Sequence, residues 1–132
     1  MKRLKIPKLR DKVWRMFSLY IRLSEANSDG YVKCVTCGKK IKAAGENECQ
    51  AGHFKHGKSQ ECYFDERNVW PQCIDCNHFH KTRAQQEYTL FLVEKYGSKV
   101  VKDLLESKKV AWKREHLEDL YEVYKKKVEA LQ

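Results

Sequence analysis

Two pairs of cysteines, Cys34-Val-Thr-Cys37 and Cys73-Ile-Asp-Cys76, constrain the fold of this chain more than any other feature. Four thiolates satisfy tetrahedral zinc completely, and Gly38, directly after the first pair, suits the tight turn of a zinc knuckle. The stretch from residue 31 to about residue 76 has few large aliphatic side chains. We therefore expect one structural Zn²⁺ to stabilise it, held by Cys34, Cys37, Cys73 and Cys76. Two unrelated thiol pairs are the alternative.

The other two cysteines allow two interpretations. Together with His53 and His56, Cys49 and Cys62 form a Cys-x3-His-x2-His-x5-Cys run, a conceivable second zinc site. The spacings are tighter than in the usual two-Cys, two-His pattern. Free cysteines are often small buried apolar residues, and the sequence favours that interpretation for both.

The charge of the chain favours a nucleic acid as partner. Lys and Arg number 27 against 18 Asp and Glu among 132 residues, a formal net charge of +9. Such a surplus suits a polyanion, although an ordinary basic protein is the alternative. No stretch is apolar for long enough to span a bilayer, and Arg15 and Arg22 interrupt the apolar run near the N-terminus. We expect a cytoplasmic protein, in a host cell if a phage encodes it, that is neither secreted nor membrane-bound and keeps its cysteines reduced.

The hydrophobic pattern predicts an α+β protein of one domain, residues 1–132. A helix is expected over residues 8–26, starting near Pro7, and helices again from about Cys76 onward, with breaks at Gly97-Ser98 and at Ser107–Val110. Short strands are expected where β-forming residues are bounded by Gly, Lys or Asp: Tyr31–Val35, Cys49–Phe54 and Glu61–Phe64. The domain divides into a basic arm with the N-terminal helix (1–30), a zinc-stabilised core (31–90) and a C-terminal helical brace (91–132).

An apolar stripe runs along the last predicted helix. Its members recur at intervals of four and three residues: Leu117, Tyr121, Tyr124, Val128 and Leu131. Packing on the N-terminal helix, through Trp14, Phe17 and Ile21, is the first interpretation. A contact between two copies of the chain is the alternative.

Several motifs, taken in order, resemble one family. The segments CVTCG (34–38), AGHF (51–54) and FDERNVWPQC (64–73), then Asn77, Tyr88, Leu92 and Tyr96-Gly97, are similar to the phage NinG recombination proteins, also called Rap. The resemblance runs from about Asp11 to Leu131. The order of the motifs also resembles the HNH, or ββα-metal, nucleases that carry a four-cysteine zinc.

This resemblance implies a small zinc-stabilised ββα-metal module flanked by an N-terminal helix and C-terminal helices. It implies a metal-dependent, structure-selective endonuclease that hydrolyses phosphodiester bonds in branched DNA such as D-loops and Holliday junctions. Mg²⁺ or Mn²⁺ would serve as the catalytic ion. A zinc-stabilised DNA-binding protein without nuclease activity is the alternative. A sequence-specific HNH nuclease is a third, less favoured because no added DNA-reading domain is visible.

The resemblance also assigns site residues. His53, on a predicted strand, is the expected general base. Asn77 follows the last zinc cysteine, as in the similar phage endonuclease VII, and is an expected ligand of the catalytic ion, with His80 three residues further on. Gln50 stands where the family usually has Asp, and it is a weaker candidate ligand. Asn68 is expected to join the two strands by backbone hydrogen bonds.

Each of these residues also has a structural alternative. His53 can fill the small core, Asn77 can cap or turn a helix, and His80 can face solvent or DNA. His56 and His78 are lesser candidates for the site.

Basic residues around these motifs are candidate DNA contacts. They are Lys55, Lys58, Arg67, Lys81 and Arg83, and a basic arm carries Lys2, Arg3, Lys5, Lys8 and Arg10. Since no base-reading helix is visible, we expect recognition of DNA by shape, and a homodimer is possible because a junction has two-fold symmetry.

Overall fold

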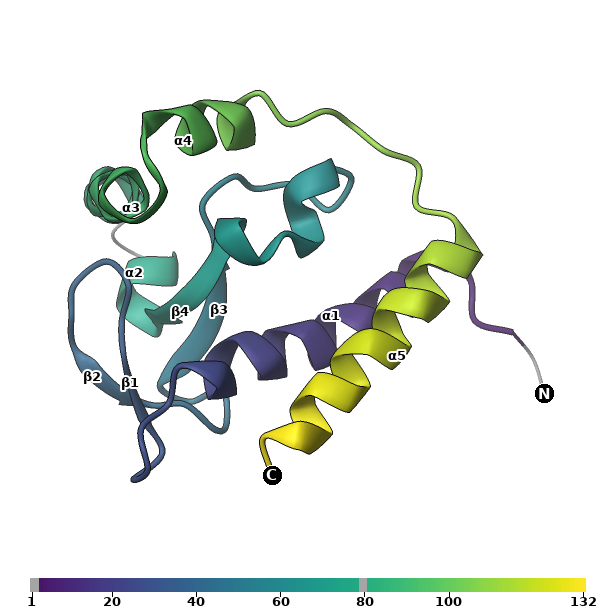
Figure 1. Ribbon diagram of the computed structural model, residues 1–132, viewed down its shortest axis with the longest axis horizontal. Helices are drawn as coiled ribbons and strands as arrows, with labels where there is room; N and C mark the ends of the chain where they lie inside the picture. Colours follow the sequence, from purple (N-terminus) through teal and green to yellow (C-terminus); the bar gives the residue numbers. More distant parts are fainter. Residues whose placement is uncertain (1–2, 79–80) are drawn as a thin grey trace.

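The computed structural model describes residues 3–78 and 81–132 and has the expected mixed α+β composition (Figure 1). Its elements in chain order are α1 (Ile6–Ser24), β1 (Tyr31–Lys33), β2 (Lys40–Lys42), β3 (Cys49–His53), the 3-10 helices η1 (Glu61–Phe64) and η2 (Glu66–Asn68), β4 (Val69–Cys73), α2 (Ile74–His78), α3 (Lys81–Tyr96), α4 (Ser98–Leu105) and α5 (Arg114–Ala130). Among the described residues, no helix is both long and apolar enough to cross a bilayer.

The strands form two small antiparallel sheets, of which the β3–β4 pair lies between the helices (Figure 1). Strand β1 pairs with β2, and β3 pairs with β4 in a register that sets Cys49 opposite Cys73 and His53 opposite Val69. Helix α2 follows β4 directly, so β3, β4 and α2 occur in β-β-α order. In Figure 1, α1 and α5 lie on one side of the β3–β4 pair and α3 and α4 lie on the other.

The expected elements are confirmed in part. The first helix, the strand at Cys49–His53 and the helix break at Gly97 are present, and Gly97 has a φ of 92° that only glycine adopts readily. The strand expected at Tyr31–Val35 ends earlier, at Lys33, because the N–H of Val35 turns to the carbonyl of Pro71 on β4, at 2.8 Å.

The strand predicted at Glu61–Phe64 is wrong. This segment is the 3-10 helix η1, in which Cys62, Tyr63 and Phe64 are all buried. Cys62 lies in the core under α3 and α4, whereas Tyr63 and Phe64 both lie in the core built by α1 and α5. In a strand, successive side chains point to opposite faces, so the adjacent Tyr63 and Phe64 could not share one core as they do in the 3-10 turn.

Two strands of the structure were not expected. Strand β4 includes Pro71, which lacks an N–H and therefore argues against a paired strand. Pro71 is nevertheless in register with Ala51 of β3, while its carbonyl accepts from Val35 on the other edge. Strand β2 has one buried residue, Ile41, between two exposed lysines, too short a pattern to recognise.

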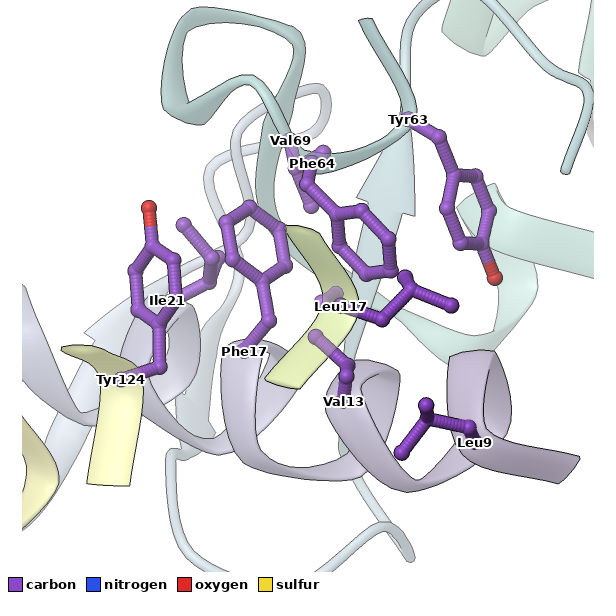
Figure 2. Close-up of a cluster of buried hydrophobic side chains, with 10 residues drawn as sticks. Leu9, Val13, Phe17, Ile21, Tyr63, Phe64, Val69, Leu117 and Tyr124 are labelled. Carbon is purple, nitrogen blue, oxygen red and sulfur yellow. The ribbon is translucent and has the colours of Figure 1, made fainter. Parts of the chain in front are cut away.

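Helices α1 and α5 pack against each other and build the largest core, shown in Figure 2. Leu117, Tyr124 and Val128 of the predicted stripe are buried, and the Phe17 ring meets the Tyr124 ring edge to face at 4.8 Å. The expected packing of the stripe on the N-terminal helix is confirmed. These three side chains are therefore unavailable for the alternative contact between two copies of the chain.

Candidate metal centre and active-site cleft

The four predicted zinc ligands meet in one cluster. The Sγ atoms of Cys34, Cys37, Cys73 and Cys76 all lie within 4.8 Å of one another. The Sγ atoms of Cys37 and Cys73 are 3.8 Å apart. Four sulfurs placed tetrahedrally around zinc, with Zn–S of about 2.3 Å, are separated by about 3.8 Å. The cluster fits a metal ion such as zinc.

Local backbone geometry sets up this cluster. The N–H of Gly38, at a φ of 76°, donates to the carbonyl of Cys34 at 2.9 Å, which closes the turn that carries the first cysteine pair. Cys73 ends β4 and Cys76 lies in α2. The hydrogen bond from Val35 to Pro71 then attaches the turn to β4, so the two pairs face each other.

The pKa values of the clustered thiols indicate that a nearby cation is needed to ionise all four. Burial raises the pKa of the Cys34 thiol, but the Thr36 hydroxyl and backbone N–H groups outweigh burial and bring that pKa down to about 6. Burial raises the pKa of Cys76 to about 12. One thiolate therefore forms readily, whereas further deprotonation needs a nearby positive charge. An all-sulfur donor set is one that zinc accepts.

The conceivable second zinc site is not assembled. Over the described residues, the four-cysteine cluster is the one group of three or more His, Cys, Asp or Glu side chains positioned to share an ion. Cys49 is fully buried beside Cys34 and Cys73, whereas Cys62 is buried in a different core under α3 and α4. Both are the small buried residues that the sequence favoured.

A cleft of about 490 Å³ lies between α1, β3, η1 and α2. Its lining includes three of the predicted site residues, Gln50, His53 and Asn77, together with the lesser candidates His56 and His78. These residues are distant in the sequence and meet because β3 lies next to α1 and α2. His80, also predicted for this site, lies outside the described residues.

His53 ends β3 and enters the cleft as a neutral imidazole. Burial lowers its pKa to about 4, and the hydrogen bond to a carbonyl only partly opposes this shift. Its Nε2 lies 3.0 Å from the backbone oxygen of Tyr63. Because a carbonyl only accepts, Nε2 carries the hydrogen and Nδ1 is left as the acceptor of the ring. The imidazole is therefore in a form that can take up a proton at Nδ1.

Two aromatic rings contact this imidazole. The ring centroid of Trp14, on α1, is 4.6 Å from that of His53 with 21° between the planes. Tyr63 stacks on His53 at 4.7 Å and 12°. The sequence placed Trp14 in the interface between the terminal helices and not in the site. Helical periodicity shows that Trp14 lies on the buried face of the first helix, but it does not show which strand residue contacts Trp14.

The side chain of Gln50 is hydrogen-bonded to two other candidate site residues in the cleft, Asn77 and His78. Its side-chain oxygen accepts from the Nδ2 of Asn77 at 2.8 Å, and the Nε2 of His78 lies 2.6 Å from the same oxygen. Glu46 lines the cleft as well. Amide and carboxylate oxygens are the kind of donor that Mg²⁺ and Mn²⁺ accept. Over the described residues, no group of three or more His, Cys, Asp or Glu side chains is placed here to share an ion, and the amide at position 50 carries no charge.

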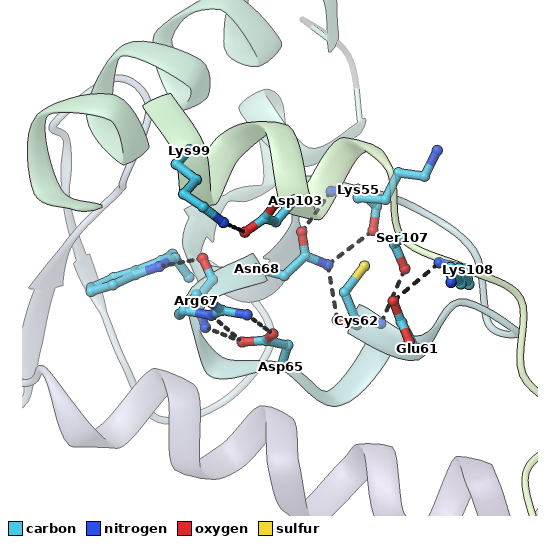
Figure 3. Close-up of polar contacts among 11 residues, drawn as sticks. Lys55, Glu61, Cys62, Asp65, Arg67, Asn68, Lys99, Asp103, Ser107 and Lys108 are labelled. Carbon is cyan, nitrogen blue, oxygen red and sulfur yellow. Dashed lines mark hydrogen bonds and ion pairs between the residues drawn. The ribbon is translucent and has the colours of Figure 1, made fainter. Parts of the chain in front are cut away.

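Asn68 faces the protein interior, away from the cleft. It is fully buried. Its Oδ1 accepts from the N–H of Lys55 at 2.8 Å, and its Nδ2 donates to the carbonyls of Lys55 and Cys62, each at 3.0 Å (Figure 3). These bonds join the end of η2 to the segment after β3, which is the structural task that the resemblance implied for it.

Of the five predicted DNA-contacting residues, Lys58 lines the cleft. Its Nζ is 3.8 Å from the carboxylate of Asp11, and both side chains are exposed, so the ion pair is a weak constraint. Lys55 serves the fold through its backbone, as partner of Asn68.

The remaining predicted contacts lie elsewhere or are not described. Arg67 makes a two-pronged pair with Asp65, at 2.8 and 3.1 Å, and does not line the cleft (Figure 3). Arg83 lines a separate hollow beside Cys73 and Cys76. The side chain of Lys81 lies outside the described residues.

Comparison with known proteins identifies the family. The profile of the family described as "Bacteriophage Lambda NinG protein" matches residues 2–132. The chain is 31% identical to protein ninG of Salmonella phage P22 over 106 residues, which are 78% of this chain and 49% of that protein. It is 30% identical to protein ninG of Escherichia phage 933W over 77 residues, 58% of this chain and 36% of that protein. The chain thus spans half or less of the length of these relatives. No solved structure matches it. This chain belongs to the phage NinG family.

Proposed function

We propose that this chain is a metal-dependent endonuclease of the HNH, or ββα-metal, type that hydrolyses phosphodiester bonds in branched DNA during phage recombination. One observation carries the proposal: a neutral, hydrogen-bonded His53 shares a cleft with Gln50 and Asn77, directly beside the four-cysteine cluster. The β-β-α order of β3, β4 and α2 and the membership of the NinG family support it. A DNA-processing enzyme of this kind works in the cytoplasm of the host cell.

In this mechanism His53 is the general base. Its Nε2–H is held by the Tyr63 carbonyl, so Nδ1 accepts the proton of a water that attacks the phosphorus. The low pKa of His53, about 4, keeps Nδ1 free at neutral pH. It also makes the imidazole a weak base, so its contribution comes from position more than from basicity.

Asn77 and Gln50, with His78 beside them, would hold the catalytic Mg²⁺ or Mn²⁺. A divalent ion at this place supplies charge to stabilise the phosphate oxygens. Asn77 follows Cys76 directly, and Gln50 follows Cys49, whose partner across the sheet is Cys73. The cysteine cluster therefore orients both amides, which gives it a positioning task in addition to its contribution to stability.

The partner is inferred from charge and family. A net charge of +9 suits a polyanion, and Lys58 at the rim of the cleft is placed to contact a phosphate. Branched DNA as the substrate rests on the resemblance to NinG recombination proteins. A homodimer formed on a four-way junction would supply two active sites with matching symmetry.

Cleavage of a substrate panel tests this function. End-labelled linear, forked and four-way DNA are incubated with zinc-loaded protein, with Mg²⁺, with Mn²⁺ and with EDTA. We expect divalent-dependent cuts near the branch point and none in linear duplex at the same protein concentration. Absence of cuts in every DNA with both ions, at concentrations where the DNA is bound, contradicts the proposal.

Gln50 favours a second candidate function. A neutral amide in place of a carboxylate binds Mg²⁺ weakly, which would suit a zinc-stabilised protein that binds branched DNA without cutting it. The same panel separates the two: binding to four-way DNA with no cleavage in either ion supports the binding protein.

A further inference from the structure

Trp14 closes one side of the catalytic imidazole proposed above. The indole on α1 stacks on His53 with ring centroids 4.6 Å apart and 21° between the planes. It also contacts Tyr63, at 5.1 Å, so the three rings touch one another. Trp14 lines the cleft itself, and its neighbour one turn along the helix, Ser18, does so too. Helix α1 thus forms a wall of the site.

The hydrogen bond from His53 to Tyr63 does not by itself hold the imidazole in place. A single bond at Nε2, 3.0 Å long, fixes the direction of one ring atom but leaves the ring plane free to turn about that direction. A flat surface against the face of the ring removes this freedom. Trp14 and Tyr63 supply such surfaces at 4.6 and 4.7 Å.

We propose that Trp14 is a positioning residue for the reaction: it sets the plane of the His53 imidazole, so that Nδ1 is directed at the attacking water. This inference rests on the proposed nuclease function and extends it to a residue of the N-terminal helix. In structural terms, α1 is then part of the active site as well as one half of the α1–α5 core.

A purely structural role of Trp14 in the core would explain its packing but not its stacking on His53. Trp14 packs against the core of Phe17, Tyr63 and Phe64, as a large aromatic residue on an amphipathic helix does. Trp112 packs against the same core, with its ring 5.2 Å from Phe64, and has no ring contact with His53 among the described residues. The two tryptophans therefore share the core, but of the two Trp14 is the one that stacks on the imidazole, while the Nε1 of Trp112 donates to the backbone carbonyl of Lys58 at 2.8 Å.

The groups that face the imidazole from each neighbouring element indicate what the loss of Trp14 does. From η1, the pKa of Tyr63 is raised by burial to about 12, so its phenol stays neutral. From the segment after β3, His56 lies at 6.2 Å, and Lys58 lines the same cleft. Glu46 and His78 also line this cleft. Because α1 contributes the uncharged indole, its removal admits water and lets the pKa of His53 rise toward its ordinary value.

Two substitutions and a control test the proposal. Trp14→Leu removes the aromatic face and much of the side-chain volume, which opens His53 to water, whereas Trp14→Phe keeps a smaller aromatic face. Trp112→Leu removes a tryptophan from the same core and leaves the ring contacts of His53 in place. Each variant is examined by NMR titration of the His53 ring protons and by cleavage of four-way DNA across pH.

The expected pattern separates positioning from packing. Trp14→Leu should raise the His53 titration midpoint by about one unit or more, move the acid limb of cleavage upward with it, and lower kcat about tenfold with little change in KM. Trp14→Phe should recover most of the parent behaviour. Trp112→Leu should lower thermal stability and leave the His53 midpoint where it is in the parent.

An unchanged His53 midpoint in a folded Trp14→Leu, or the same change in Trp112→Leu, overturns the proposal. If Trp14→Leu does not fold, the nuclear Overhauser contacts between the Trp14 and His53 rings of the parent decide instead, and their absence overturns it. The NMR titration requires no cleavage. A protein that never cuts DNA but shows the Trp14-dependent midpoint therefore refutes the nuclease and not the stacking.

Discussion

The side-chain oxygen of Gln50 accepts a hydrogen bond from the Nδ2 of Asn77 at 2.8 Å, which links β3 to α2 in the lining of the cleft. His78 reaches the same oxygen at 2.6 Å. Position 50 thus contacts two of the other candidate residues. For the divalent ion proposed above, a neutral amide at this position is a weaker ligand than a carboxylate would be.

Gln50→Glu should therefore tighten binding of the divalent ion, because it adds a carboxylate with almost unchanged size. We expect the Mn²⁺ concentration for half-maximal binding, measured calorimetrically on zinc-loaded protein, to fall about tenfold. Gln50→Leu is the matched loss of the oxygen and should weaken binding. Equal affinity in all three proteins would show that position 50 does not contact the ion.

The cysteine cluster predicts one zinc ion per chain. Cys76→Ser should lose the zinc and unfold residues 31–78, since structural zinc in small domains contributes on the order of 10 kcal/mol. Cys62→Ser is the matched control, because Cys62 is buried outside the cluster. Metal content by mass spectrometry and thermal melting measure both. A parent protein with no zinc and a melting curve insensitive to chelation would refute the cluster as a metal site.

Local spacing predicted the metal cluster and the terminal helices, but it failed where long-range pairing decides the structure. The Cys-x-x-Cys spacing and the apolar stripe at Leu117–Leu131 are local patterns. The first predicted the cysteine cluster and the second predicted the packing of the last helix on the first. Strand β4 was missed because Pro71 is unfavourable in a strand judged alone. Its pairing with β3 and its carbonyl bond to Val35 outweigh that preference.

The candidate site was predictable to a similar extent. The resemblance to NinG proteins indicated His53, Asn77 and Gln50, and the structure brings all three to one cleft. Trp14 was missed as a site residue because its contact with His53 joins residues far apart in the chain. Arg67 stays a predicted DNA contact; the structure adds that its guanidinium pairs with Asp65, a contact that composition does not reveal.

The folded protein should lose stability as the pH falls from about 6.5 to about 4. The pKa of His53 is lowered by burial to about 4, below its ordinary value of 6.5, so in this window the unfolded chain binds a proton that the folded chain excludes. Above pH 6.5 the imidazole is neutral in both states and no stability is lost. His53→Gln should flatten this part of the urea-derived stability profile. Parallel profiles for parent and His53→Gln at equal zinc content would contradict the low pKa.

The α1–α5 core should depend on Leu117 and not on Leu131, although both belong to one stripe. Leu117 has 0% of its surface exposed, so Leu117→Ala should lower the free energy of unfolding by about 2–5 kcal/mol. Leu131 is 46% exposed, and Leu131→Ala should change it by less than about 0.5 kcal/mol. Urea denaturation measures both. Similar effects of the two substitutions would mean that α5 packs differently, for example between two copies of the chain.

His53 as the base of a DNA-cutting site is the central proposal, and a single-turnover cleavage rate tests it most directly. The measurement uses four-way DNA with Mn²⁺ and compares parent protein with His53→Ala, at equal zinc content and equal DNA binding. We expect the parent to cleave the junction and His53→Ala to cleave it at a rate lower by about 100-fold or more. Cleavage by His53→Ala at the parent rate would contradict the proposal, and so would a parent protein that binds the junction and never cuts it.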